Sequence, residues 1–123
     1  MMKINNKVKL IRTYNECFIT NDFDKILSLV TDDVEWEVIG DRHLKGKEKM
    51  KEFLYSMPTD MESSLKLDHI LTHGYEATCN GKVSYVNSKG EKGEVHFCDV
   101  FTFKGLKDPR ISKMTSYIIE VKH

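Results

Sequence analysis

The sequence predicts an α+β fold in which three helices from the first half of the chain pack on one face of a curved, mostly antiparallel sheet. Apolar residues recur at spacings of three and four near the start of the chain, which is typical of amphipathic helices. Later in the chain, apolar and polar residues mostly alternate between glycine-containing turns, which is typical of strands. The 123 residues, 40% hydrophobic and 31% charged, carry no repeat or linker, so we expect a single domain over residues 1–123.

Three segments have the apolar spacing of helices. The first carries one stripe along its length: Ile4, Val8, Ile11, Asn15 and Phe18. The second follows the sequence TNDFD, in which Asn21 is expected to cap the helix, with Asp24 near its positive end. The third runs through Met50 to Met57 and should end at Pro58, because proline is a common helix stop.

The sequence DDVEWEVIG switches to a period of two. Its apolar residues share one face, so we expect a half-buried strand that ends at Gly40 and leads into a polar loop, DRHLKG. Further strands are expected over residues 64–73 and 75–87, with Gly81 at a bulge or Asn80-Gly81 at a hairpin turn. The turns NSKGEKG and KGLKDPR precede the last two strands, the second of which contains ISKMTSYIIEV.

One acidic residue interrupts the most apolar strand face in the chain. In VHFCDVFTF, the other residues on the face of Asp99 are all apolar: Val95, Phe97, Phe101 and Phe103. Apolar surroundings disfavour a carboxylate, so we expect Asp99 to be buried, with a raised pKa, and largely neutral at pH 7. Two roles are open: a group that serves a pocket, or a structural carboxyl bonded to a backbone amide or to Tyr14.

The order of these elements, with five short motifs, resembles the NTF2-like superfamily and, within it, the SnoaL-like and ketosteroid isomerase-related branch. The motifs lie at residues 14–24 (a tyrosine followed by DFD), 32–38 (DDVEWEV), 44–54 (LKGKEKMKEFL), 97–105 (FCDVFTFKG) and 111–117 (ISKMTSY). Together they span nearly the whole chain. The resemblance implies a cone, in which the sheet curls around the helices and leaves a mostly apolar pocket inside.

The resemblance also implies two catalytic candidates. In ketosteroid isomerases, a tyrosine on the first helix and a neutral aspartic acid on the penultimate strand donate hydrogen bonds to an enolate oxygen, and Tyr14 and Asp99 match these positions. Those enzymes also need a carboxylate base on the first strand, where this chain has Val38. An aliphatic side chain cannot accept a proton, which argues against classical ketosteroid isomerase activity. Asp41 or His43, in the following loop, could substitute for the base.

The pocket wall is expected to include six apolar residues: Trp36, Val38, Leu54, Phe97, Phe101 and Met114. In a hollow cone these side chains can be core and binding wall at once. We therefore expect a SnoaL-like protein that binds a small, largely apolar, carbonyl-bearing molecule. If it is an enzyme, it is a cofactor-independent isomerase, cyclase or dehydratase. The alternatives are a non-catalytic ligand binder, or a dimeric protein-interaction module with a filled pocket.

Composition and motif content argue against several other classes. Nineteen basic and nineteen acidic residues cancel, so there is no electrostatic case for nucleic acid or an anionic membrane. The chain shows no transmembrane-length apolar run, no signal-peptide pattern, and no phosphate-binding or dinucleotide-binding glycine motif. The histidines His69 and His73 lie roughly 13 Å apart on a strand, too far to share a metal. We therefore expect neither a metal nor a cofactor.

Two expectations concern the surroundings of the protein. Three cysteines at scattered positions favour reduced thiols and a cytoplasmic location. The outer strand faces should expose a set of apolar and threonine side chains: Val100, Thr102, Thr115, Tyr117 and Ile119. Such a patch usually marks an interface, so we expect a homodimer.

Overall fold

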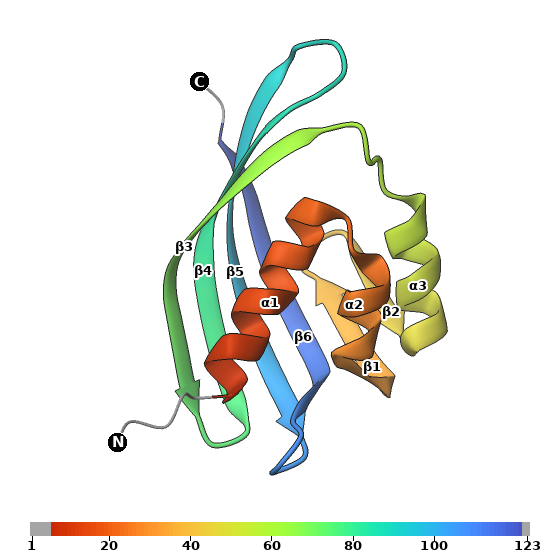
Figure 1. Ribbon diagram of the computed structural model, residues 1–123, viewed down its shortest axis with the longest axis vertical. Helices are drawn as coiled ribbons and strands as arrows, with labels where there is room; N and C mark the ends of the chain where they lie inside the picture. The colour runs from red at the N-terminus through yellow and green to blue at the C-terminus, as the bar shows by residue number, and fades with distance from the viewer. Residues whose placement is uncertain (1–5, 122–123) are drawn as a thin grey trace.

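In the computed structural model, which describes residues 6–121, three helices lie on one face of a six-stranded sheet (Figure 1). The helices are α1 (Asn6–Thr20), α2 (Phe23–Ser28) and α3 (Lys47–Ser56). The strands are β1 (Val30–Val38), β2 (Arg42–Lys45), β3 (Glu62–His73), β4 (Glu76–Val86), β5 (Lys92–Lys104) and β6 (Arg110–Val121). This arrangement confirms the α+β class and the three helices in the first half of the chain.

The sheet has the strand order β2-β1-β6-β5-β4-β3. Only β1 and β6 run parallel, and every other neighbouring pair of these strands is antiparallel, which confirms the mostly antiparallel sheet. In Figure 1 the long strands β3 to β5 curve past α1. The parallel pairing sets Trp36 beside Met114 and Val38 beside Ser116, so the first strand and the last one build a common inner face.

The segment expected to be a polar loop forms the edge strand β2. It pairs with β1 in antiparallel register, with Trp36 opposite Leu44 and Val38 opposite Arg42. Gly40, with a φ of 79°, lies in the turn that joins the two strands. The expectation was wrong because an edge strand is held by backbone hydrogen bonds to one neighbour and does not require an alternating apolar pattern. On β2 only Leu44 is half-buried, and the other three residues are exposed.

The cap expected at Asn21 belongs to Asp22. The Asp22 side chain accepts a hydrogen bond from the Lys25 amide, at 3.2 Å, and so satisfies the start of α2. Asn21 instead has a φ of 58°, in the left-handed region that asparagine tolerates better than most residues. It therefore reverses the chain between α1 and α2.

The core lies between the helices and the inner face of the sheet. Its largest fully buried side chains include Ile11, Ile26, Leu54, Phe101 and Met114. On β5 the expected alternation holds around Asp99, since Asp99, Phe101 and Phe103 are buried while Val100 and Lys104 are exposed. The strand pattern therefore placed this aspartate on the correct face.

Gly81 lies inside β4, so the hairpin turn considered for Asn80-Gly81 does not form. The irregularity is in the partner strand, where the register with β4 shifts between Leu67 and His69. A Cβ on Gly81 would overlap the backbone carbonyl oxygen of Lys66, so the two strands approach each other here as only glycine allows.

Gly81→Ala is therefore expected to lower the free energy of unfolding by about 2 kcal/mol, because the added methyl meets backbone that cannot rotate away. Gly93→Ala is the matched control, since the three atoms nearest to a Cβ there all belong to the Tyr85 side chain, which can move. Urea unfolding of both variants tests this. Equal losses in the two variants would contradict the backbone contact at Gly81.

Candidate functional site

A cavity of about 310 Å³ lies between α1, the inner face of the sheet and the segment that joins α3 to β3. Its walls are mainly apolar, with Trp36, Phe97, Val83 and Val95 from the sheet. Its polar lining residues include Tyr14, Asn15, Asp99 and Ser116, together with Asn21, Ser63 and Tyr85. A cavity of this size that is apolar except for a few convergent polar groups is typical of a small-molecule site.

Asp99 sits at the polar part of this cavity and is only 8% exposed. In the sheet it lies directly between Cys79 on β4 and Ser116 on β6. Burial raises its pKa to about 6, and a hydrogen bond from the Ser116 hydroxyl, which favours the ionised form, opposes part of that rise. The expected direction is correct, but with a pKa of about 6 the ionised form of Asp99 dominates at pH 7, so the expected neutrality is wrong.

Tyr14, on α1, lines the same cavity as Asp99. Its ring packs edge-on against Phe18, at 5.1 Å between centroids, and against Phe101, at 5.9 Å. Burial, followed by the nearby Asp99 and Cys79, raises the pKa of Tyr14 well above its ordinary value, so its hydroxyl keeps its proton. Within residues 6–121 this hydroxyl has no hydrogen-bond partner and is not sealed from solvent, which leaves it available to a ligand.

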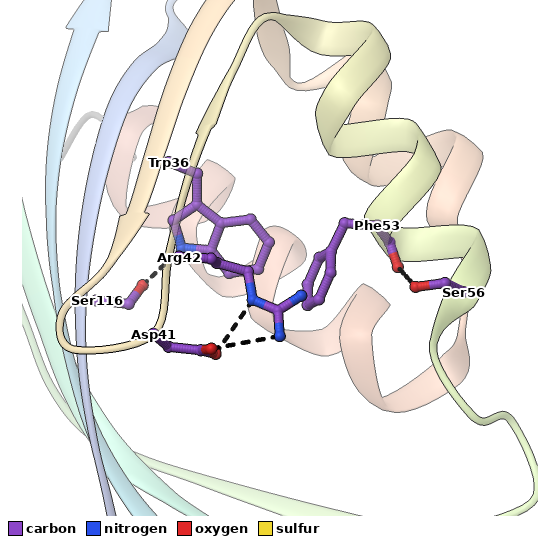
Figure 2. Close-up of polar contacts among 6 residues, drawn as sticks. All are labelled: Trp36, Asp41, Arg42, Phe53, Ser56 and Ser116. Carbon is purple, nitrogen blue, oxygen red and sulfur yellow. Dashed lines mark hydrogen bonds and ion pairs between the residues drawn. The ribbon is translucent and has the colours of Figure 1, made fainter.

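Trp36 forms one wall of the cavity, and its indole is held from both sides. Its Nε1 donates a hydrogen bond to Ser116 Oγ at 2.9 Å (Figure 2). Its ring lies edge-on to Phe18 and Phe53, at 6.0 and 5.4 Å between centroids. The guanidinium of Arg42 then lies over Phe53, 4.1 Å from the ring centroid, and also pairs with Asp41.

The structure places some of the residues predicted for the site in the cavity wall and others outside it. Trp36 and Phe97 line the cavity, as do Tyr14 and Asp99. Four further residues expected in the pocket wall are buried in the core and are not part of that lining: Val38, Leu54, Phe101 and Met114. Asp41 and His43 are exposed and pair with Arg42 and Glu35, so neither is directed into the cavity. The binding and catalytic roles of all these residues remain predictions.

Sequence reasoning missed Asn15 and Ser116. Asn15 is buried, and its side-chain amide donates to Ile11 O at 2.9 Å and to Cys79 Sγ at 3.6 Å. Asn15 is a polar residue on the otherwise apolar stripe of the first helix. A polar residue on an apolar face is also the signal that singled out Asp99. Ser116 carried no local signal, because only the pairing of β5 with β6 brings it to Asp99.

Three further findings bear on the class of protein. Within residues 6–121, no helix is both long and apolar enough to cross a membrane. In the same range, no three histidine, cysteine, aspartate or glutamate side chains come together as a metal site requires. Cys17, Cys79 and Cys98 are all free thiols.

Comparisons with known proteins agree with this geometry. The family described as SnoaL-like domain matches residues 11–114. No curated protein sequence matches the chain. Among solved structures, an NTF2-like protein of unknown function from Burkholderia pseudomallei is 18% identical, with a TM-score of 0.80, over 94% of this chain and 92% of that one.

Two further structures carry functional names of their own. A putative SnoaL-like polyketide cyclase from Shewanella putrefaciens is 13% identical, with a TM-score of 0.81, over 94% of this chain and 81% of that one. An LEH-like epoxide hydrolase from M. tuberculosis is 17% identical, with a TM-score of 0.75, over 90% of this chain and 80% of that one. At these identities the likeness bears on the fold, and it confirms the NTF2-like cone.

The raised pKa of Asp99 predicts how stability depends on pH. Because the folded value of about 6 lies above the ordinary 3.8, the stability that Asp99 contributes is fully present below 3.8 and is lost as pH rises through 6. Asp99→Asn cannot ionise. Between pH 4 and pH 8 its free energy of unfolding should therefore rise, relative to wild type, by roughly 2–3 kcal/mol.

Urea unfolding of both proteins across this pH range measures the difference, and general effects of acid on the rest of the chain cancel. A mutant that instead weakens relative to wild type as pH rises would identify Asp99 as a favourably paired carboxylate. Asp99 would then be a structural anchor.

Proposed function

The chain belongs to the SnoaL-like domain family, and from that premise we propose that it binds a small, largely apolar, carbonyl-bearing molecule in the cavity. Tyr14 and Asp99 act on the carbonyl group of this ligand. The observation that carries the proposal is that both line the same mainly apolar cavity: Tyr14 with a hydroxyl that has no partner in the described chain, and Asp99 with a buried carboxyl.

Tyr14 is the oxygen-binding group in this proposal. Its hydroxyl keeps its proton, since its pKa is raised, and so donates a hydrogen bond to the carbonyl oxygen. Such a bond is worth more inside an apolar cavity than in water, and it strengthens as negative charge develops on the oxygen.

Asp99 is the proton-transfer group. With a pKa of about 6 its ionised form dominates at pH 7, and a base with a pKa near the working pH is effective in both directions. The carboxylate takes a proton from the carbon next to the carbonyl, and the C–H electron pair forms the enolate, whose oxygen Tyr14 holds. Return of a proton from the neutral Asp99 to carbon completes the cycle without a cofactor.

This sequence of proton transfers is common to isomerisation, cyclisation and dehydration of carbonyl compounds. The names of two structural relatives, a putative polyketide cyclase and an epoxide hydrolase, support a reaction on a small oxygen-bearing molecule. Because Asp99 itself supplies the base, the proposal does not need a carboxylate at Val38.

A second candidate function is non-catalytic binding in the same cavity. It is favoured by Val38, which stands where ketosteroid isomerases have their base, and by Ser116, which commits part of the Asp99 carboxyl to an internal hydrogen bond. A ligand that binds in the cavity without proton transfer would distinguish this candidate from the catalytic one.

The test uses 1-tetralone, a bicyclic enolisable ketone, in D₂O. Binding is followed by the fluorescence of Trp36, the one tryptophan of the sequence and part of the cavity wall, and proton transfer by deuterium exchange next to the carbonyl. Tyr14→Phe should weaken binding about tenfold, by loss of one hydrogen bond. Asp99→Asn should slow the exchange by about 100-fold or more.

The exchange rate of the wild type should rise as pH increases through 6 and then level off, because the carboxylate is the active form. Tyr55→Phe removes a hydroxyl outside the cavity and serves as the matched control, with no expected effect. Binding without catalysed exchange would leave the non-catalytic candidate. Failure of the ketone to bind would contradict both.

We also propose a homodimer formed through the outer face of the sheet. Val100 on β5 and Tyr117 and Ile119 on β6 are exposed and face away from the helices, with Leu71 on β3 exposed nearby. Covering these side chains with a second copy would remove apolar surface from water.

Sedimentation at micromolar concentration should accordingly give a species of twice 14.3 kDa. Ile119→Asp should shift it towards the monomer, because it places a charge in the apolar patch, while leaving the cavity intact. A wild type that sediments as a monomer would refute the dimer.

A further inference from the structure

We propose that Trp36 and Ser116 are positioning residues for Asp99: the Trp36 indole donates to Ser116 Oγ at 2.9 Å, and Ser116, which lies directly opposite Asp99 in the register of β5 and β6, donates to the Asp99 carboxyl. The series crosses three neighbouring strands, from β1 through β6 to β5. Such a series uses one carboxyl oxygen of Asp99 and leaves the second oxygen for a ligand in the cavity that Asp99 lines. This inference deepens the proposed function and rests on it for its catalytic meaning, but the hydrogen bonds can be tested without any ligand.

The chemistry of the donors sets the direction of the series. An indole N–H can only donate, so Ser116 Oγ accepts at the 2.9 Å contact with Trp36. A serine hydroxyl has a single proton, and Asp99 is the acceptor that the described residues place beside it. The Asp99 oxygen that accepts from Ser116 cannot also carry a proton towards it, so a proton gained by Asp99 sits on the other carboxyl oxygen.

The placement of Trp36 explains why the indole can orient Ser116. Phe18 and Phe53 pack against its ring from α1 and α3, and the guanidinium of Arg42 lies over the ring of Phe53 (Figure 2). These ring contacts restrict the rotation of the indole, whose N–H donates to Ser116 Oγ. A serine in contact with a mobile donor would be free to turn its hydroxyl.

The other ionisable groups that face Asp99 do not compete with this effect. They are Tyr14 on α1 and Cys79 on β4, and the pKa of each is raised, that of Cys79 to about 12. Both stay neutral over the range in which Asp99 titrates. Ser116 is therefore the main local group that favours the carboxylate over the neutral acid.

The test exploits the fact that Trp36 is the one tryptophan in the sequence. Its indole N–H gives a single resonance in an ¹⁵N-labelled sample, and the carboxyl carbon of Asp99 reports titration directly. In the wild type we expect the indole resonance to move with pH at the midpoint of Asp99, about 6, because the hydroxyl transmits the change of charge. In Asp99→Asn the indole resonance should stay still.

Ser116→Ala should abolish the response of the indole and raise the midpoint of Asp99 by about one pH unit, since the carboxylate loses a charge-assisted hydrogen bond. Ser116→Thr keeps a hydroxyl and should restore both. Trp36→Phe, which keeps an aromatic ring beside Phe18 and Phe53, should raise the midpoint by less than Ser116→Ala does.

Ser112→Ala is the matched control. It removes a hydroxyl from the same strand, one that donates to the backbone oxygen of Thr102 at 3.1 Å, so it has a comparable structural cost and should move neither signal. The proposal would be overturned by an indole resonance that does not shift as Asp99 titrates in the wild type, or that still shifts in Ser116→Ala. So would an Asp99 midpoint that stays constant or falls in Ser116→Ala. If Ser116→Ala does not fold, Trp36→Phe decides: no rise in the midpoint overturns the proposal.

Discussion

The burial of one carboxyl group, Asp99, is the constraint on which the rest of this structure depends. A carboxylate removed from water is costly unless a hydrogen bond compensates it, and here the Ser116 hydroxyl does so. That bond requires β6 to lie beside β5 in the observed register. The indole that contacts Ser116 in turn requires β1 to lie beside β6, and this is the single parallel pairing in the described sheet.

The cavity that this arrangement forms has both apolar walls and hydrogen-bonding groups. Its sheet walls are apolar along Phe97, Val95 and Val83, while Tyr14 and Asp99 supply hydrogen-bonding groups at one place. A ligand with one oxygen-bearing end and an apolar body satisfies both parts, and the reverse orientation would leave polar groups unpaired. In the proposed function, the lining of the cavity therefore orients the ligand carbonyl.

The sequence predicted the parts of this account that depend on local periodicity. Alternation placed Asp99 on an apolar face, and helical spacing predicted the helix that carries Tyr14. That the two side chains share a pocket was implied by the family resemblance. Pairing between strands could not be predicted in the same way, because no local sequence pattern shows which strand β2 pairs with or which residue lies beside Ser116. The protonation of Asp99 shows the consequence. Periodicity predicted burial and the raised pKa that burial causes, but not the opposing effect of Ser116, which only the sheet register brings to Asp99.

The central claim is that a ligand carbonyl meets Tyr14 and Asp99 inside the cavity. The most direct measurement is the ¹³C chemical shift of carbonyl-labelled 1-tetralone bound to the protein. Hydrogen bonding should move this resonance downfield of its position in a hydrocarbon solvent, and Tyr14→Phe should reverse most of that movement. A bound ketone whose carbonyl resonates as it does in hydrocarbon would contradict the claim.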